Sequence, residues 1–253
     1  MTEPMLQATD VAWSYGAGVG SGVDGITLAL HPGTITGFLG RNGAGKTTTI
    51  KLLAGVLVPQ RGTITVGGLP SSSSASASAS SSAARTRIGW APEDPPTVAG
   101  MTVREHLQTA MDLAASTPSA GHRSIDNVVM ALDLGAVVHR LAGALSKGTR
   151  QRLGVAMALC GAPAVLLLDE PTAGLDPAQV DALRQLIRAE AARGAAILLS
   201  SHVTAELAAV ADDVVAINAG RTVFAGPIGS LEEATRAALA LPVAPPAHAS
   251  VPS

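Results

Sequence analysis

Hydrophobic residues along the chain fall into short continuous runs that alternate with stretches of helical periodicity. The runs Ala164–Leu168 and Ile197–Leu199 are apolar throughout, and Ile35–Leu39 contains a single polar residue, Thr36. All three runs predict buried strands. Between the last two runs, Asp176-Pro177-Ala178-Gln179 combines an N-cap residue, a first-turn proline and a polar third position, and the helix it opens ends near Gly194. Strands that alternate with helices predict an α/β fold with a parallel sheet.

Further strands are predicted on both sides of this core. Their residues are alternating or β-branched and are bounded by glycine, proline or asparagine turns. They comprise Leu6–Tyr15, Ile26–Leu30, Thr63–Val66, Ile88–Trp90 and a hairpin of Val214–Ile217 with Thr222–Phe224. The glycine-rich segment 16–22 between the first two strands is expected to be a flexible turn.

The middle of the chain is predicted to be helical. Apolar residues recur at helical spacing over residues 102–113 and 125–134, which indicates a small helical insert between about residues 95 and 145. Ser146 is expected to cap the next helix, which runs towards Gly161. The Ser- and Ala-rich segment 71–82 has no face to bury, so we expect a mobile loop, and the Pro- and Ala-rich residues 241–253 are expected to fray.

Composition limits the class of protein. The chain has 253 residues, of which 47% are hydrophobic and 2% aromatic, so it can build a large core from Leu, Val, Ile and Ala. A formal net charge of −2 gives no support to a nucleic-acid partner. Cys160 is the only cysteine, which excludes an internal disulfide, and we expect it to be a small buried residue on a helix.

Neither a membrane span nor a signal peptide is predicted. The richest apolar run, Leu153–Leu168, is broken by two glycines and a proline and falls short of the about 20 apolar residues that a span needs. The N-terminus carries Glu3 and Pro4 and lacks the charged-then-apolar order of a signal peptide. We therefore expect a soluble, cytoplasmic protein; if it works at a membrane, another chain supplies the membrane part.

A glycine-rich loop follows the strand Ile35–Leu39 and precedes a predicted helix, Thr49–Val56. The loop fits the phosphate-binding pattern G-x-x-x-x-G-K-S/T. Its glycines allow backbone N–H groups to approach phosphate oxygens, and the helix N-terminus adds partial positive charge. Lys46 is expected to reach the β- and γ-phosphates, and Thr47 to bind Mg²⁺. The loop comprises Gly40, Arg41, Asn42, Gly43, Ala44, Gly45, Lys46, Thr47 and Thr48.

Polar side chains follow two other predicted strands directly. Asp169 and Glu170 end the run Ala164–Leu168, and His202 comes shortly after Ile197–Leu199. In a parallel sheet such positions meet at one edge, where ligands bind. Asp169 suits a contact to Mg²⁺, directly or through water, and Glu170 suits polarisation of an attacking water. Taken singly, a terminal carboxylate is more often a helix cap, and a lone histidine is more often structural.

Together these features resemble the ATP-binding cassette ATPases, the nucleotide-binding subunits of ABC transporters. The resemblance covers roughly residues 6 to 230. Its most specific element is Leu145–Arg152, which is similar to the family signature L-S-G-G-Q. The remaining matches are Val165–Asp169 with Glu170 as the Walker B strand, Gly174–Pro177 as the D-loop, His202 as the switch histidine and Tyr15 as the aromatic residue that stacks on adenine.

The sequence departs from the family pattern at three positions. Lys147 and Thr149 replace a glycine and the glutamine of the signature, whereas Ser146 and Gly148 remain. Glu93 stands where the family has a loop glutamine. The variants are similar to the bacterial exporter branch that includes antibiotic-resistance cassettes. Glu93 is open to two interpretations, a Mg²⁺ contact or a solvated loop carboxylate.

The resemblance implies an α/β, P-loop NTPase parallel-sheet core with an N-terminal antiparallel β subdomain and a small helical subdomain, together forming one domain over residues 1–240. It also implies an ATPase that powers transport, with export preferred. The implied site has catalytic Glu170 and His202, nucleotide contacts from Tyr15, the loop Gly40–Thr48, Ser146, Gly148 and Asp176, and metal contacts from Thr47, Asp169 and Glu93.

The implied partners are ATP, Mg²⁺, and a second copy or a paralogue in a head-to-tail dimer. Each ATP would lie between the Lys46 loop of one chain and the Ser146 region of the other. A separate multi-span permease would contact the helical insert and the Glu93 loop and hold the protein at the inner face of the cell membrane. The alternative is a soluble single-cassette ATPase in a non-transport role such as cofactor assembly. Glu170 argues against a third option, a binding module without catalysis.

Overall fold

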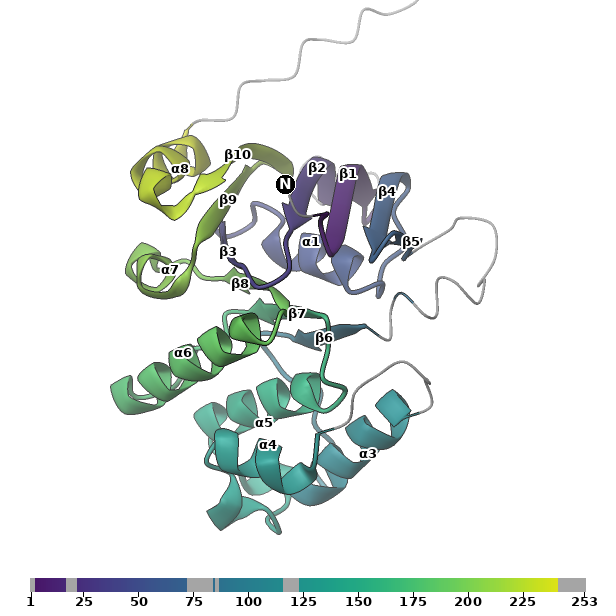
Figure 1. Ribbon diagram of the computed structural model, residues 1–253, viewed down its shortest axis with the longest axis vertical. Coiled ribbons are helices and arrows are strands. Elements are labelled where there is room, and N and C mark those ends of the chain that lie inside the picture. The colour runs from purple at the N-terminus through teal and green to yellow at the C-terminus, as the bar shows by residue number, and fades with distance from the viewer. Residues whose placement is uncertain (1–2, 17–21, 72–83, 85–86, 116–122, 241–253) are drawn as a thin grey trace, which may run out of the picture.

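The protein is described from a computed structural model (Figure 1). The described residues are 3–16, 22–71, 84, 87–115 and 123–240. The expectations of a mobile Ser- and Ala-rich loop and of a frayed tail fall on residues 72–82 and 241–253, outside the described ranges. The flexible turn expected before residue 22 also falls largely on residues that are not described, 17–21.

A six-stranded sheet forms the centre of the molecule. Its strand order is β10-β9-β3-β8-β7-β6, with β10 antiparallel to β9 and all other neighbours parallel. The strands are β3 (Ile35–Leu39), β6 (Ile88–Ala91), β7 (Val165–Asp169), β8 (Ala196–Ser200), β9 (Asp213–Asn218) and β10 (Arg221–Pro227). Strands β3, β7 and β8 are buried along their whole length, as predicted.

A second, antiparallel sheet is built from N-terminal residues. Its order is β2-β1-β4-β5, with β1 (Leu6–Ser14), β2 (Gly22–Leu30), β4 (Arg61–Val66) and β5 (Leu69–Pro70). Strand β2 begins four residues before the predicted Ile26, because Ser14 pairs with Gly22 and extends the ladder past Asp24 and Gly25. These two polar or flexible residues interrupt the alternation from which a strand is predicted.

Helices surround the large sheet. They are α1 (Lys46–Leu53), α3 (Val103–Ala115), α4 (Ile125–Ala131), α5 (Lys147–Leu159), α6 (Pro177–Ala192), α7 (Thr204–Val210) and α8 (Leu231–Leu239). Short 3₁₀ turns lie at Gly135–Val137, Ala142–Ala144 and Ile228–Ser230. Helix α1 packs between the two sheets, where Ile50, Leu52 and Leu53 join one core cluster. Helices α3, α4 and α5 gather beside the β6 and β7 side of the molecule (Figure 1).

Two predicted helix starts are present in the structure. The Ser146 hydroxyl accepts from Thr149 N–H at the start of α5, and Asp176 forms a capping box with Gln179 at the start of α6. Helix α1 differs, since it begins at Lys46 and not at Thr49. Its N-cap is Gly45, with no side-chain hydrogen bond to the first turn, so no side chain marks the start in the sequence.

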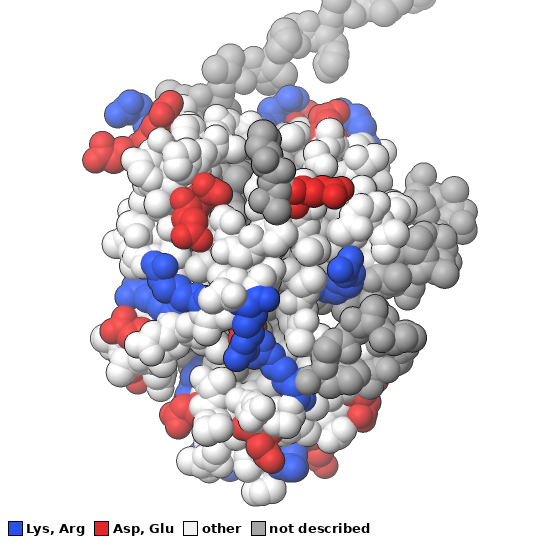
Figure 2. Space-filling model, in the orientation of Figure 1, with Lys and Arg blue, Asp and Glu red and all other residues white. Residues whose placement is uncertain are grey.

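The fold is therefore an α/β, P-loop NTPase fold with a parallel core and an antiparallel N-terminal sheet. Cys160 follows α5 and is fully buried, as predicted. Burial raises the pKa of its thiol to about 11, because the apolar surroundings disfavour the thiolate. Charged side chains are sparse on the face shown in Figure 2, where Lys and Arg lie in small groups interspersed with Asp and Glu.

Candidate functional site

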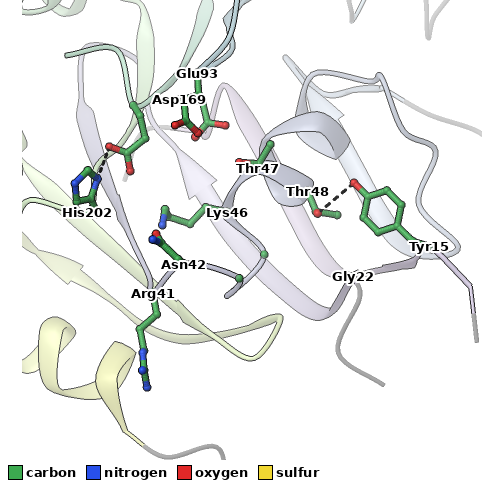
Figure 3. Close-up of a pocket in the computed structure, with 13 residues that line it drawn as sticks. Tyr15, Gly22, Arg41, Asn42, Lys46, Thr47, Thr48, Glu93, Asp169 and His202 are labelled. Carbon is green, nitrogen blue, oxygen red and sulfur yellow. Dashed lines mark hydrogen bonds and ion pairs between the residues drawn. The ribbon is translucent and has the colours of Figure 1, made fainter. Parts of the chain in front are cut away.

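A cavity of about 440 Å³ opens at the carboxyl ends of β3, β7 and β8. Three segments far apart in the sequence meet there, namely the glycine loop, the Asp169-Glu170 pair and His202 (Figure 3). The cavity is lined by Tyr15, Gly22, Arg41, Asn42, Gly43, Gly45, Lys46, Thr47, Thr48, Glu93, Asp169, Glu170 and His202. This is the edge of a parallel sheet at which ligands of α/β proteins bind.

The glycine loop turns sharply before helix α1. Gly43 and Gly45 have φ angles of 80° and 105°, a region that side chains rarely adopt. A Cβ on Gly45 would also lie 2.7 Å from Val23 Cγ1, so two constraints select glycine there. Among the described residues, no side chain caps the first turn of α1. Its N–H groups are therefore available for an anion in the cavity.

Lys46 lies inside the loop that precedes it. Its side chain is mostly buried, and Nζ donates to Gly40 O at 2.7 Å. An ammonium group has three donors, so this bond fixes the side chain across the loop and leaves others for phosphate oxygens. Ala44 is buried beneath the loop and its carbonyl accepts from Gly220 N–H, which ties the loop to the β9–β10 turn. Gly40 and Ala44 thus shape the loop from behind the cavity.

Tyr15 stands at the far end of the cavity from the acidic residues (Figure 3). Its ring packs edge-on against Trp13, with centroids 4.1 Å apart at an interplanar angle of 88°. The hydroxyl group lies 3.5 Å from Thr48 Oγ1. The side chain is 57% exposed, so a face of the ring is open to a planar ligand.

The acidic residues are held in defined positions. Asp169 is almost fully buried, and its Oδ1 accepts a 2.6 Å hydrogen bond from Ser200 Oγ. Its Oδ2 is buried and has no hydrogen-bond partner among the described residues. Glu170 Oε2 lies 2.9 Å from His202 Nδ1. The backbone of Glu170, unlike that of Asp169, is left-handed, at φ 48°.

The oxygen atoms near Asp169 suit a metal ion that takes most of its ligands from phosphates and water. Figure 3 places Glu93 and Asp169 on the same side of the cavity as Thr47. No cluster of three His, Cys, Asp or Glu side chains able to hold a metal occurs among the described residues. Mg²⁺ is commonly held by one or two protein oxygens together with phosphates and water, which this arrangement fits.

Besides Gly40 and Ala44, which lie behind the loop, three predicted site residues lie outside the cavity. Ser146 and Asp176 are exposed at the starts of α5 and α6, and neither they nor Gly148 are among the residues that line it. Gly148 is packed against the turn before α6, where a Cβ would lie 2.5 Å from Gly174 O. The signature and D-loop segments are therefore joined to each other, and one chain does not bring them to its own phosphate loop.

Two groups of contacts were not foreseen from the sequence. Ser200 contacts both Asp169 and Glu170, since its Oγ also accepts from Glu170 N–H at 3.0 Å. Glu206 Oε2 accepts from Thr172 Oγ1 at 2.9 Å and from Ser201 Oγ at 2.8 Å. Ser200 and Ser201 directly follow the apolar run of β8. Their place at the end of a predicted strand is the only feature of the sequence that could have indicated a role at the site.

This fold and cavity define a P-loop nucleotide-binding protein. Residues 23–173 match the family described as ABC transporter. The bacitracin transport ATP-binding protein BcrA of Bacillus licheniformis is 35% identical over 233 residues, which are 92% of this chain and 72% of BcrA. The Nod factor export ATP-binding protein I of Burkholderia pseudomallei is 36% identical over 212 residues, which are 84% of this chain and 68% of that protein.

A solved structure agrees with these relatives. It is titled "Structure of ATP binding subunit of ABC transporter", superposes with a TM-score of 0.79 and is 27% identical, covering 92% of this chain and 94% of its own. The chain belongs to the ABC transporter family, as an ATP-binding ATPase subunit that powers transport. Among the residues that the structure describes, no helix has the length and hydropathy of a membrane span.

Proposed function

We propose that this ATPase subunit drives export through a separate membrane permease, using Mg²⁺ and ATP held between two copies of the chain or between the chain and a paralogue. The observation that carries the proposal is a division of the predicted site. Lys46, Asp169 and Glu170 share one cavity, whereas Ser146 and Gly148 lie outside it. A site divided in this way becomes complete when a second cassette supplies the missing half.

ATP binding follows from the shape of the cavity. Tyr15 at one end offers an exposed ring for adenine, and Lys46 with the α1 N-terminus at the other offers donors for the phosphates. Thr47 and Thr48 directly follow the lysine and line the same cavity. The triphosphate would therefore extend along the loop, with its γ-phosphate towards Glu170 and His202.

The metal assignment rests on Asp169 Oδ2, which has no hydrogen-bond partner in the part of the chain that the structure describes. A buried carboxylate oxygen without a partner is costly unless a cation or water satisfies it. The Thr47 hydroxyl and Asp169 Oδ2 would hold Mg²⁺, and Glu93 is the third candidate. Bound there, Mg²⁺ would neutralise negative charge on the phosphates.

Glu170 and His202 would carry the catalytic roles. Glu170 accepts a proton from the attacking water or orients it, because its carboxylate enters the cavity directly after the Asp169 strand end. The 2.9 Å contact with His202 Nδ1 restrains the carboxylate. His202 is mostly exposed, which leaves the other ring nitrogen accessible to a γ-phosphate or to a second chain.

The second half of the site would come from the partner cassette. Ser146 is exposed at the N-terminus of α5, where a hydroxyl and main-chain N–H groups can meet a γ-phosphate. Asp176 is exposed at the start of α6 and would approach the same interface. In a head-to-tail arrangement each chain would complete the other's site, which is a cyclic, self-complementary contact.

An apolar groove supports the membrane partner. A cavity of about 360 Å³ lies between β6, α3 and α5. Its described lining carries no charged residue and consists of Ile88, Gly89, Trp90, Pro92, Pro96, Ala110, Leu113, Ala114, Gly154, Met157, Ala158, Gly161 and Pro163. Leu113 is 70% exposed beside it. Exposed apolar surface of this kind marks a docking site, and we assign it to a permease segment.

The same loop connects this groove to the nucleotide. Pro92 and Pro96 line the groove, whereas Glu93 lines the ATP cavity. Movement of a docked segment against Pro92 or Pro96 would therefore displace Glu93, which lies in the same loop. Export as the direction rests on the departures at Glu93 and Lys147 and on relatives named for export. Localisation at the inner membrane face follows from the permease.

The docking part is tested by purification from native membranes. A tagged chain recovered from detergent-solubilised membranes should bring down a multi-span protein, and Leu113→Glu should abolish this because it places a charge in the groove. Leu113→Glu should keep its thermal stabilisation by ATP, which shows that the cassette is intact. Recovery of the parent without a multi-span protein would contradict the proposed docking to a permease.

A further inference from the structure

We propose that Ser200 is a positioning residue for ATP hydrolysis, one that holds both acidic residues through a single hydroxyl group. The inference rests on the proposed roles of Asp169 and Glu170. Ser200 ends β8 and is the parallel ladder partner of Asp169 at the end of β7. Its side chain is fully buried, so its hydroxyl has no access to bulk water.

The hydrogen-bond directions around this hydroxyl are determined. Glu170 N–H can only donate, so Ser200 Oγ accepts it at 3.0 Å. The single hydroxyl hydrogen is then free to donate to Asp169 Oδ1, at 2.6 Å. That distance is typical of an O–H donor to an ionised carboxylate. One hydroxyl therefore connects the side chain of Asp169 to the main chain of Glu170.

The first consequence concerns the orientation of Asp169. With Oδ1 used by Ser200, the carboxylate plane is fixed, and Oδ2 is the oxygen left without a partner among the described residues. This is the oxygen available to Mg²⁺ or to a metal-bound water. Without the Ser200 hydroxyl, Asp169 can rotate, and its two oxygens no longer differ.

The second consequence concerns the backbone of Glu170. Its φ of 48° is rare for a residue with a side chain and persists only where the surroundings impose it. Ser200 holds the N–H side of this residue, and Ala173 N–H donates to its carbonyl at 3.1 Å. The carboxylate is directed towards His202 from this backbone. Ser200 thus fixes the direction in which Glu170 projects.

The test uses Ser200→Ala, with Ser201→Ala as a matched control. Ser201 is the next residue and is almost fully buried, but its hydroxyl donates to Glu206 and not to Asp169 or Glu170. Ser200→Ala should lower kcat by about 10- to 100-fold, the loss expected when a buried hydrogen-bonded pair loses its partner. The Mg²⁺ concentration for half-maximal hydrolysis should rise severalfold. Ser201→Ala should keep kcat within about threefold.

ATP binding separates positioning from general damage. Thermal stabilisation by ATP with EDTA should be the same in parent and Ser200→Ala, because the phosphate loop is untouched. If Ser200→Ala does not fold, Ser200→Cys keeps the size with a weaker donor and should show a smaller loss of kcat. An unchanged kcat in Ser200→Ala, or an equal loss in Ser201→Ala, overturns the inference. A parent that does not hydrolyse Mg-ATP would instead overturn the proposed function.

Discussion

Lys46 is the residue whose contribution to binding can be isolated most directly. Lys46→Ala removes the charge that is held across the loop by Gly40 O. In the parent, ATP at a hundredfold excess over Kd should raise the melting temperature by about 5–10 °C, and in the variant the shift should largely vanish. Differential scanning fluorimetry measures both.

Lys51→Ala is the matched control for this experiment. Lys51 lies in the last turn of the same helix, outside the residues that line the cavity, and its removal should leave the ATP-dependent shift intact. Equal shifts in the parent and in Lys46→Ala at subsaturating ATP would show that the loop is not the binding site.

Cys160 offers a probe of the folded core. With a thiol pKa of about 11, only about one thiol in a thousand is ionised at pH 8. We therefore expect iodoacetamide to label the native protein at least about 100-fold more slowly than the protein in guanidinium chloride, where the pKa returns towards 8.5. Mass spectrometry follows this single site, and equal rates would show that Cys160 is accessible.

Sequence reasoning found those site residues whose chemistry depends on local spacing. The loop Gly40–Thr48 acts through consecutive backbone groups, so its pattern is visible in one stretch. Ser200 was missed as a site residue because its role depends on the register between β7 and β8, which places it opposite Asp169. A serine at the end of an apolar run does not reveal its ladder partner.

At the scale of elements, a strand or helix was predicted correctly where one local feature of the sequence, such as an apolar run or a capping residue, marked it clearly. The buried strands β3, β7 and β8 and the side-chain caps of α5 and α6 were predicted, because burial on both faces and capping leave marks in the sequence. The two-residue strand β5 and the short helix α7 were not predicted. Their formation depends on neighbours in space, since neither is long enough to show a periodicity.

Helix α5 and the turn before α6 form a unit that can be tested at Gly148. In Gly148→Ala the new Cβ would lie 2.5 Å from Gly174 O, so the two segments must separate. We expect ATP-dependent dimerisation to be lost and hydrolysis to fall at least about tenfold, because Ser146 and Asp176 are displaced together. Binding of ATP by the monomer should persist.

Gly135→Ala provides the comparison for that variant. A Cβ on Gly135 meets no heavy atom within 4 Å, and the residue lies in the same helical part of the chain. It should dimerise and hydrolyse ATP as the parent does. Normal dimerisation of Gly148→Ala, measured by light scattering, would show that the close contact with Gly174 is not needed.

At the scale of the whole molecule, the two halves of the site face different surroundings. The phosphate loop and the acidic residues are fixed by the two sheets, whereas Ser146 and Asp176 begin exposed helices outside the cavity. In the proposed dimer, binding energy from ATP would bring the two chains together, and hydrolysis would release them. The apolar groove beside α3 and β6 is lined by Pro92 and Pro96 of the loop that carries Glu93, so in the proposed complex closure would be transmitted to the docked permease.

Glu170→Gln separates binding, closure and hydrolysis in one protein. The change keeps the size of the side chain and its contact with His202 but removes the charge and the basicity. ATP should still bind, and hydrolysis should fall by about 10²- to 10⁴-fold, the range for loss of a general base. Because ATP then persists, a dimer should accumulate with ATP and Mg²⁺ and be absent with ADP, as size-exclusion chromatography with light scattering would show.

The possible outcomes of this experiment distinguish two assignments. Hydrolysis near the parental rate in Glu170→Gln would remove Glu170 from the catalytic role. An inactive variant that stays monomeric would leave catalysis in place and contradict the composite site built on Ser146 and Gly148. In that case Lys147→Gly is the next variant to test. A Cβ on Gly174 would lie 3.4 Å from the Lys147 side chain. This side chain adds bulk and charge to the surface that must meet the partner's ATP.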